Sequence, residues 1–369
     1  MTDAFPFGQW VAAAKVHNVM TSLSGSDGGA SAQPRATMRD VAALAGVSLK
    51  TVSRVVNGEP GVSEPLARKV LAAAERLQYR PNLGASSLRR SDRRTATIGL
   101  LLPDVANPFS SALHRAVEDV AVARGVAVLA ASLDEDPDRE ARLAGAFAQR
   151  RVDGLIVVPA SHDHAYLRAE QQAGTALVFV DRPPVLLSAD AVLADGRAGA
   201  ADGVRHLVEH GHRRIGFLGD LATITTAQDR LEGYRDALDA AGLAHEPDLV
   251  RSGLRTVEQA ESAALALLER PDPPTALFAG QNLVTIGTIR ALRRLGRQHE
   301  VALVGFDDFL LADLLEPAVT VVAQDPAAMG TLAAQVLFAR IDGDAGPATT
   351  RVIPTRLVPR GSGELPPAR

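Results

Sequence analysis

The pattern of apolar residues divides the chain into a short helical part and a longer part in which strands and helices alternate. Between Thr37 and Tyr79, apolar residues recur at helical spacing and predict three short helices. From Thr95 to about Val358, continuous apolar runs alternate with amphipathic stretches. The runs that predict buried strands are TIGLLLP, VAVLAAS, VDGLIVVPA, ALVFVDRP, AVLAD, RIGFLGD, TALFAG, VALVGFD and TVVAQD. Such strands, separated by helices, indicate an α/β fold with parallel sheets covered on both faces.

The amphipathic stretches between these runs predict the covering helices. About ten strands are more than one open sheet commonly holds, so we expect a body of two similar lobes. Ligands of such folds bind at the carboxyl ends of the strands, and a two-lobed version binds them in the cleft. The expected helices include Phe109–Arg124, Arg139–Gln149, Ala198–His210, Ala227–Ala241 and Val257–Glu269.

The helical part carries the turn and capping residues of a helix-turn-helix. Thr37, with Asp40 three residues later, forms a capping-box pattern at the first helix. Gly46 permits a tight turn, after which Ser48 caps the second helix, and Ser63 is expected to cap the third. A bundle of this kind presents its second helix to the major groove of DNA. The side chains expected inside the bundle are Val41, Leu44, Ala45, Val52, Val55, Val56, Val70, Leu71, Ala74 and Leu77.

The charges are distributed unevenly along the chain. Residues 37–94 contain eleven Lys/Arg and five Asp/Glu, a net charge of +6, whereas the whole chain carries −4. The remainder therefore carries −10 by the same count. A basic head on an acidic body suits a polyanion that is bound at one end of the protein only.

Composition narrows the chemistry further. The chain has no cysteine, which excludes disulfides, thiolate metal sites and cysteine nucleophiles. His206 and His210 have the spacing of a zinc pair, but no acidic ligand accompanies them in the sequence, so we expect no metal. No GxGxxG, Walker or GxSxG motif follows a strand, so we expect neither an enzyme nor a cofactor. Because no apolar run approaches the ~20 residues that span a bilayer and no secretory signal is evident, we expect no membrane partner and a cytoplasmic location.

Five regions are expected along the chain. Residues 1–36, which end in a Gly/Ser-rich stretch, are predicted to be a disordered extension. Residues 37–81 form the helix-turn-helix domain, and residues 82–94 form a hinge. The two-lobed body spans residues 95–358. Residues 359–369 are predicted to be a flexible C-terminal tail.

Six sequence runs together resemble one family of regulators. They are TMRDVAALAGVSLKTVSRVVNG, the YRPN step into the hinge, NPF after the first strand, HGHRRIGFLG, GFDD and VAQD. The chain resembles the lactose-repressor (LacI/GalR) family of bacterial transcription regulators over nearly its whole length. The resemblance implies a homodimer in which each head reads one half of a near-palindromic double-stranded operator. It also implies that a body similar to periplasmic sugar-binding proteins senses a small molecule.

The same resemblance assigns roles to residues of the head. Arg54 can make the bidentate guanine contact, the commonest specific contact of a side chain with a base. Lys50 reaches either a base or only a phosphate, and Leu49 either touches a thymine methyl group or packs within the head. The residues implied to read bases are Leu49, Lys50 and Arg54, and those implied to contact phosphates are Ser48, Thr51, Ser53 and Asn57.

The segment after the head resembles the hinge of the family, which becomes helical when two copies lie side by side on the operator. Leu88 matches a leucine that enters a central minor-groove step and kinks the DNA, and Ala85 matches a small residue before it. Asn82, at the start of the segment, is also expected to contact DNA. Ser86 stands where many members carry a basic residue, which weakens the expected backbone contacts.

Residues of the body are implied to hold the effector, which is expected to be a sugar or a sugar derivative. Phe109 offers a ring face, Arg230 grips the ligand, and Asp307 accepts hydroxyl groups. Asp181 and Arg182 fall at a strand end beside a crossing between the lobes. A few polar groups beside an aromatic wall suit polyols better than apolar ligands. The expected effector contacts are Asn107, Phe109, Asp181, Thr226, Arg230, Gln281, Asp307 and Gln324.

Three departures from the family bear on the effector. Gln281-Asn282 replaces the usual Asn-Asp pair, Leu254 lies near a position that is frequently aromatic, and Ile224 stands where purine-sensing relatives carry arginine. A nucleobase effector is therefore the less favoured alternative, and a solute-binding protein is the alternative from another class. The implied mechanism is a ligand-dependent shift between states that bind DNA well and poorly. Because no leucine heptad follows the body, we expect dimers rather than tetramers.

Overall fold

The computed structural model describes residues 36–56, 59–80 and 94–367, and these residues form two compact units, one ending at Thr95 and one beginning at Ala96. None of the described helices is long and apolar enough to cross a membrane. Several sequence predictions lie outside the described residues, namely the extension before Ala36 and the roles of Asn57, Asn82, Ala85, Ser86 and Leu88.

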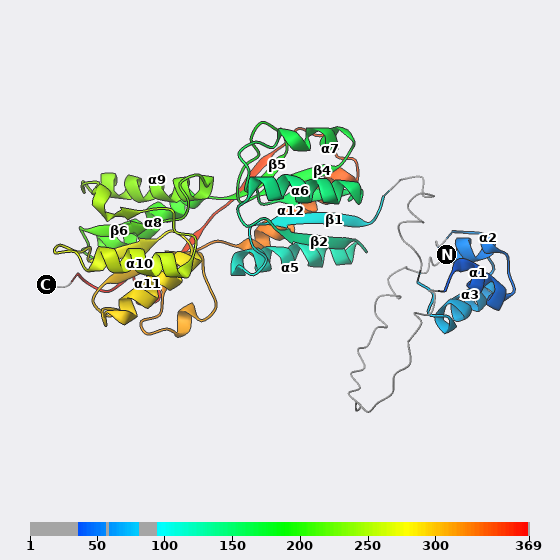
Figure 1. Ribbon diagram of the computed structural model, residues 1–369, viewed down its shortest axis with the longest axis horizontal. Helices are drawn as coiled ribbons and strands as arrows, with labels where there is room; N and C mark the ends of the chain where they lie inside the picture. The colour runs from blue at the N-terminus through cyan, green and yellow to red at the C-terminus, as the bar shows by residue number, and fades with distance from the viewer. Residues whose placement is uncertain (1–35, 57–58, 81–93, 368–369) are drawn as a thin grey trace, which may run out of the picture. The chain divides into compact units, whose positions relative to one another are not determined.

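The first unit is a bundle of three helices, α1 (Met38–Ala45), α2 (Leu49–Val56) and α3 (Glu64–Arg76) (Figure 1). The predicted capping box is confirmed, because the Thr37 hydroxyl accepts from the amide of Asp40 at 3.4 Å while the Asp40 carboxylate accepts from the amide of Thr37 at 2.7 Å. Gly46 is left-handed, with φ 62°, and the Ser48 hydroxyl accepts from the amide of Thr51 at 3.1 Å. Ser63 occupies the N-cap position of α3, as predicted, but its side chain makes no capping hydrogen bond.

The core of the head is smaller than predicted. Leu44 was wrongly placed inside, since 42% of it is exposed. The inward face of α1 is centred on Val41 and Ala45, with Met38 and Ala42 beside them, and Leu44 falls beyond its edge. Val55 and Val56 are only partly buried against the core. The buried residues of this bundle are Val41, Ala45, Val52, Val70, Ala73, Ala74 and Tyr79.

The second unit contains two lobes, each a six-stranded sheet between helices (Figure 1). The sheet of lobe 1 is parallel throughout, in the order β11-β5-β4-β3-β1-β2. Helices α5 and α12 cover one face of it, and α6 and η2 cover the other. The elements of lobe 1 are β1 (Thr97–Leu102), α5 (Pro108–Ala123), β2 (Ala127–Ser132), α6 (Pro137–Gln149), β3 (Gly154–Val157), η2 (Ala165–Leu167), α7 (Arg168–Gln172), β4 (Ala176–Val180), β5 (Asp190–Ala194), α12 (Pro326–Ile341) and β11 (Thr350–Ile353).

The sheet of lobe 2 has the order β12-β10-β9-β8-β6-β7 and is parallel except for the β10–β12 pair. Helices α8 and α9 cover one face, and α10 and α11 cover the other. The elements of lobe 2 are α8 (Gly196–Glu209), β6 (Ile215–Leu218), α9 (Thr225–Ala240), η3 (Pro247–Leu249), β7 (Val250–Arg251), α10 (Val257–Leu268), β8 (Ala276–Ala279), α11 (Asn282–Arg294), β9 (Ala302–Phe306), η4 (Ala312–Leu314), β10 (Thr320–Ala323) and β12 (Arg356–Val358).

The chain passes between the lobes three times. It leaves lobe 1 after β5, returns after β10, and crosses again between β11 and β12. The predicted α/β class and the two similar lobes are confirmed, and the predicted apolar runs correspond to β1–β6 and β8–β10. The crossings place the carboxyl ends of strands from both lobes beside one another, which is where a parallel fold exposes polar side chains to a ligand.

The C-terminal segment is part of lobe 2 through residue 367, so its prediction as a flexible tail was wrong. Ser362 is buried; its hydroxyl donates to the Leu303 carbonyl at 2.6 Å, and its amide donates to the Ala318 carbonyl at 2.9 Å. Glu364 accepts from the Thr320 hydroxyl at 2.8 Å and lies 2.6 Å from Nε2 of His206. The Gly- and Pro-rich composition of residues 359–369 predicted a flexible tail. The sequence did not reveal these hydrogen bonds, because each partner is more than 40 residues distant in the sequence. Glu364 is also the acidic neighbour of His206 that the sequence pattern did not reveal.

Candidate functional site

The expected DNA-reading residues lie on and beside α2. Leu49 and Lys50 occupy its first turn and are exposed, so Leu49 is not a core residue of the head. Nε of Arg54 lies 3.8 Å from a carboxylate oxygen of Glu59, and both side chains are about half exposed. An exposed ion pair of this length contributes little stability, so Arg54 is free to exchange Glu59 for another partner. The hydroxyls of Ser48 and Thr51 lie 2.9 Å apart at the start of the helix.

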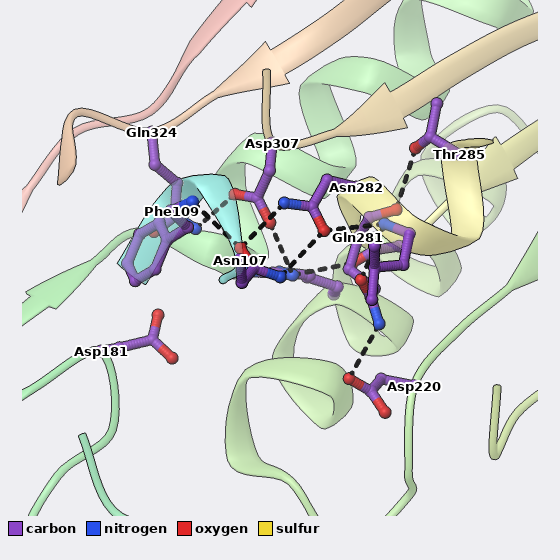
Figure 2. Close-up of polar contacts among 12 residues, drawn as sticks. Asn107, Phe109, Asp181, Asp220, Gln281, Asn282, Thr285, Asp307 and Gln324 are labelled. Atoms are coloured by element: carbon purple, nitrogen blue, oxygen red, sulfur yellow. Dashed lines mark hydrogen bonds and ion pairs between the residues drawn. The ribbon is translucent and has the colours of Figure 1, made fainter. Parts of the chain in front are cut away.

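In the body, polar side chains gather where strands of both lobes end (Figure 2). In lobe 1, Asp181 directly follows β4 and Asn107 lies beyond β1 at the start of α5. In lobe 2, Asp220, Gln281 and Asp307 follow β6, β8 and β9. Gln324 directly follows β10, at the crossing back to lobe 1. Because the carboxyl ends of parallel strands share one edge of a sheet, neighbours in space come from distant parts of the sequence.

An amide pair joins the two lobes within this group. Nδ2 of Asn107 donates to Oδ1 of Asn282 at 3.3 Å, and Nδ2 of Asn282 donates to Oδ1 of Asn107 at 3.1 Å. The same oxygens accept from amides in the first turns of α5 and α11, at Phe109 and Leu283. Asn282 is 2% exposed. An aspartate at position 282 would have no side-chain N–H to donate, so the reciprocal contact depends on the amide of Asn282.

Arg230 is the central cation of the group and is only 7% exposed. Its Nη1 donates to the Gly280 carbonyl at 2.7 Å and lies 3.6 Å from a carboxylate oxygen of Asp307. Its guanidinium stacks 3.9 Å above the ring of Phe306. Gln324 donates to Asp307 at 2.6 Å. Within the described residues, Nε of Arg230 and Oε1 of Gln324 are buried without a hydrogen-bond partner, so both remain able to meet a ligand.

The remaining expected contacts are placed less centrally. Phe109 packs partly against the core of lobe 1, and Thr226 lies half-buried in the first turn of α9. Gln281 caps α11 by accepting from the Leu283 amide, and its Nε2 donates to Asp220 at 3.2 Å. In Figure 2, Asp181 lies on the same side of the group as Phe109 and has no marked contact.

The sequence did not single out two acidic residues of this region. Glu135 holds both terminal nitrogens of Arg182, at 2.6 and 2.7 Å, while Nε of the same guanidinium has no hydrogen-bond partner among the described residues and lies 3.6 Å from an Asp181 oxygen. Asp220 accepts from Gln281 and from the Leu221 amide. Asp220 ends the predicted strand RIGFLGD, as Asp307 ends VALVGFD, and this shared position was a usable signal. Glu135 lies in a run of acidic residues, where the sequence shows nothing to distinguish it.

Burial controls the ionisation of the acids in the cleft. Burial raises the pKa of Asp181 above its ordinary value of 3.8, although Arg182 and Arg230 partly oppose the shift. Burial likewise raises the pKa of Asp220. A raised pKa means that the folded protein holds the proton more tightly than the unfolded chain does. The stability that the protonated Asp181 carboxyl contributes is present at low pH. It is lost as the pH rises from 3.8 through the raised pKa.

Asp181→Asn is therefore expected to raise the melting temperature by a few degrees at pH 7 to 8. The difference should vanish below about pH 4, where the wild-type carboxyl is protonated in both states. The backbone of residue 181 has φ 68°, which asparagine tolerates well. Thermal unfolding between pH 4 and pH 8 measures the effect, with exposed Asp202→Asn as the control. A lower melting temperature at pH 8 would contradict the account of burial given above.

The geometry defines a class of protein, a two-lobed ligand sensor joined to a helix-turn-helix head. Comparisons identify the family. Residues 37–82 match the bacterial regulatory proteins of the lacI family, and residues 204–363 match the periplasmic binding protein-like domain. The HTH-type transcriptional regulator GalR of Escherichia coli (strain K12) is 34% identical over 333 residues, covering 90% of this chain and 96% of its own. The HTH-type transcriptional regulator CelR of Thermobifida fusca is 34% identical over 89% of this chain and 98% of its own.

Solved structures agree with these matches. The lac repressor dimer bound to operator and the anti-inducer ONPF has a TM-score of 0.79 and 26% identity, over 89% of this chain and 99% of its own. The complex of the regulator CelR with cellobiose has a TM-score of 0.65 and 33% identity, over 89% and 100%. The chain belongs to the lacI family of bacterial regulatory proteins. It is a DNA-binding transcription regulator, as predicted, and its relatives are regulators rather than enzymes.

Proposed function

We propose that this protein is a repressor that binds a near-palindromic operator as a homodimer and releases or tightens its hold when a sugar enters the cleft. The observation that carries the proposal is the convergence of polar side chains from both lobes around Arg230 and Asp307. Carboxylate, amide and guanidinium groups beside the Phe109 ring suit a ligand rich in hydroxyl groups. Among its relatives, one solved regulator holds cellobiose, and another is named as a ribose operon repressor.

The expected effector contacts act on both lobes, so a ligand among them alters how the lobes meet. The lobes already touch through the Asn107–Asn282 pair and through Arg255, which donates to the Asp134 carbonyl at 2.8 Å. A sugar controls DNA binding if its affinity differs between two arrangements of the lobes, and no other property is required of it. We propose that Asn82, Ala85 and Leu88 pass this difference to the operator, with Leu88 entering the minor groove.

The proposal is tested by selecting genomic fragments with the purified protein at moderate ionic strength, with and without single sugars. A regulator should enrich a few near-palindromic sites, and at least one sugar should change their occupancy by tenfold or more. Enrichment no better than bulk DNA contradicts operator recognition. Enrichment that no sugar alters contradicts the assignment of a carbohydrate effector.

An exposed apolar patch supports the homodimer. Around η4, Leu310 and Leu314 are 83% and 73% exposed, and Leu311 is also exposed. Neighbouring apolar side chains with this much exposure are typical of an interface. We propose that this patch packs against a second copy of the chain.

The double variant Leu310→Asp/Leu314→Asp is expected to be largely monomeric at micromolar concentration, because two charges must then be buried in the interface. Light scattering after size-exclusion chromatography measures the molar mass. Operator affinity should fall at least tenfold, since two heads no longer bind together. Val352→Asp, an exposed apolar position on β11, is the control and should remain dimeric. A dimeric double variant would contradict this role of the patch.

A further inference from the structure

A buried pair of titratable side chains lies in lobe 1, apart from the polar group of the cleft. Glu140 of α6 and His164, directly before η2, are both 0% exposed. Nε2 of His164 lies 3.8 Å from a carboxylate oxygen of Glu140. A glutamate is almost never fully buried unless it has partners, so the groups around this pair show what it does.

Glu140 holds the loop that follows β3. One of its oxygens accepts from the amides of Ala160 and Ser161, the latter at 3.0 Å. The other oxygen accepts from the Tyr166 hydroxyl at 2.6 Å. Burial, together with Glu140, raises the pKa of Tyr166, so this hydroxyl keeps its proton and remains a donor. The carboxylate is therefore fixed in place beside the imidazole of His164.

His164 holds a second loop, residues 181–189 between β4 and β5. Its Nδ1 accepts from the amide of Val185 at 2.8 Å, and its own amide donates to the Val185 carbonyl at 3.1 Å. Val185 follows Pro183 and Pro184, which have no N–H, so its amide is the first that this part of the loop can donate. His164 thus clamps the loop at the first residue after the prolines.

The two halves of this loop are held in different ways. In the later half, the Leu186 carbonyl accepts from Arg168, a side chain that keeps its charge at every physiological pH. In the earlier half, Val185 is held by His164, a side chain that can change its charge in that range. Val185 also lines the small space between lobe 1 and the loop after β6 of lobe 2. The earlier half is therefore the part that faces the other lobe.

The hydrogen bond from Val185 fixes the protonation state of His164. A nitrogen that accepts carries no proton, so Nδ1 is bare and the proton of the neutral ring is on Nε2. Nε2 has no hydrogen-bond partner among the described residues, and the ring packs edge-on against Phe179 with centroids 4.8 Å apart. A second proton can enter only at Nδ1, where it meets the Val185 N–H. The charged ring then needs an acceptor, so Val185 must turn its amide away.

The groups that face His164 set the pH range of this exchange. Burial lowers the pKa of His164 from its ordinary 6.5; Glu140, the Val185 backbone and Asp163 oppose the shift, and His162 adds to it. With a lowered pKa, the folded protein favours the neutral ring more than the unfolded chain does. The stability that the neutral ring contributes is present above pH 6.5 and is lost as the pH falls through the lowered pKa.

We propose that His164 is an acid-sensitive clamp that holds residues 183–185 when neutral and releases them when it takes up a proton. Because this part of the loop faces lobe 2, its release alters how the lobes meet. Under the proposed function, the arrangement of the lobes governs operator binding, so acid acts on operator binding separately from the effector. Only this last step rests on the proposed function.

Hydrogen exchange of the full-length protein, read by mass spectrometry between about pH 5 and pH 7.5 and corrected for the intrinsic exchange rate, tests the clamp. In the wild type, protection of the peptide that contains Val185 should fall about tenfold or more as the pH is lowered. His164→Asn places an acceptor where Nδ1 lies but cannot titrate, so its protection should stay constant. His162→Asn removes an exposed histidine two residues away and should behave as the wild type.

Glu140→Gln separates titration of His164 from a general loss of structure in acid. Glu140 favours the charged imidazole, so its replacement by a neutral side chain should move the fall in protection to lower pH. Thermal unfolding at neutral pH checks that each variant is folded. Constant protection in the wild type refutes the clamp, as does an equal loss in His164→Asn.

Operator binding over the same pH range tests the last step, using a site found by genomic selection. The affinity of the wild type should change at least threefold more than that of His164→Asn. If protection changes as expected but the two proteins lose or gain affinity equally, the effect of acid on operator binding is refuted and the clamp stands. If selection yields no preferred site, the proposed function fails, and hydrogen exchange still decides whether the clamp exists.

Discussion

Replacing Arg54 with alanine is expected to lower the preference for operator over bulk DNA by about 10- to 100-fold while leaving the head folded. A bidentate arginine–guanine contact is worth about 1–3 kcal/mol of discrimination. Arg54 can supply that contact because its only described ion pair, with Glu59, is exposed and 3.8 Å long. Its loss removes no buried contact, so the melting temperature of the head should change little.

Competition binding measures this effect, using an operator found by genomic selection and a fixed excess of nonspecific DNA. Arg68→Ala is the matched control, since Arg68 is an exposed arginine on α3 whose partner, Glu64, is 3.9 Å away. Arg54→Lys should recover only part of the preference, because an ammonium cannot form the planar fork. Unchanged selectivity in Arg54→Ala would contradict the assignment of α2 as the recognition helix.

Arg230→Met is expected to abolish the response to sugar, with at least a hundredfold loss of sugar affinity, while operator binding without sugar persists. The variant removes the cation that faces Asp307 and the guanidinium stacked on Phe306. It also leaves Asp307 buried without its counter-ion, and breaking a buried pair in this way costs about 3–5 kcal/mol. The variant should therefore unfold at a lower temperature than the wild type.

A second substitution separates ligand binding from stability. Arg230→Met/Asp307→Leu removes both charges, so it should recover much of the melting temperature but none of the sugar affinity. Calorimetry measures the affinity, and operator binding with and without the sugar measures the response. If Arg230→Met alone still binds sugar with wild-type affinity, Arg230 is a structural residue only.

The central strands of both sheets could be predicted because each is a continuous apolar run. The edge strands β7, β11 and β12 escaped prediction. They have two to four residues, none of which is fully buried, so their sequences carry no apolar signal. What makes them strands is hydrogen bonding to β6, β5 and β10, which no local pattern encodes.

The candidate site was predictable where its residues end strands. Asp181, Gln281, Asp307 and Gln324 all follow apolar runs. The structure brings Asp307 and Gln324 together beside Arg230, whereas Gln281 bonds to Asp220. The hydrogen-bond partner of each side chain could not be predicted. Glu135 occupies Arg182 across 47 residues, and Asn282 pairs with Asn107 across 175. Such partners depend on how two lobes meet, which a single sequence does not display.

The positions of β11 and the C-terminal segment have a consequence for synthesis. β11 completes the edge of lobe 1 beside β5, and residues 356–364 complete lobe 2 beside β10 and β9. Synthesis reaches these residues after the other strands of both lobes, so neither lobe is finished until residues 350–364 have been made. Until then the growing polypeptide exposes two unpaired strand edges, which are sites of aggregation. The two lobes therefore complete their sheets together, once residues 350–364 have been made.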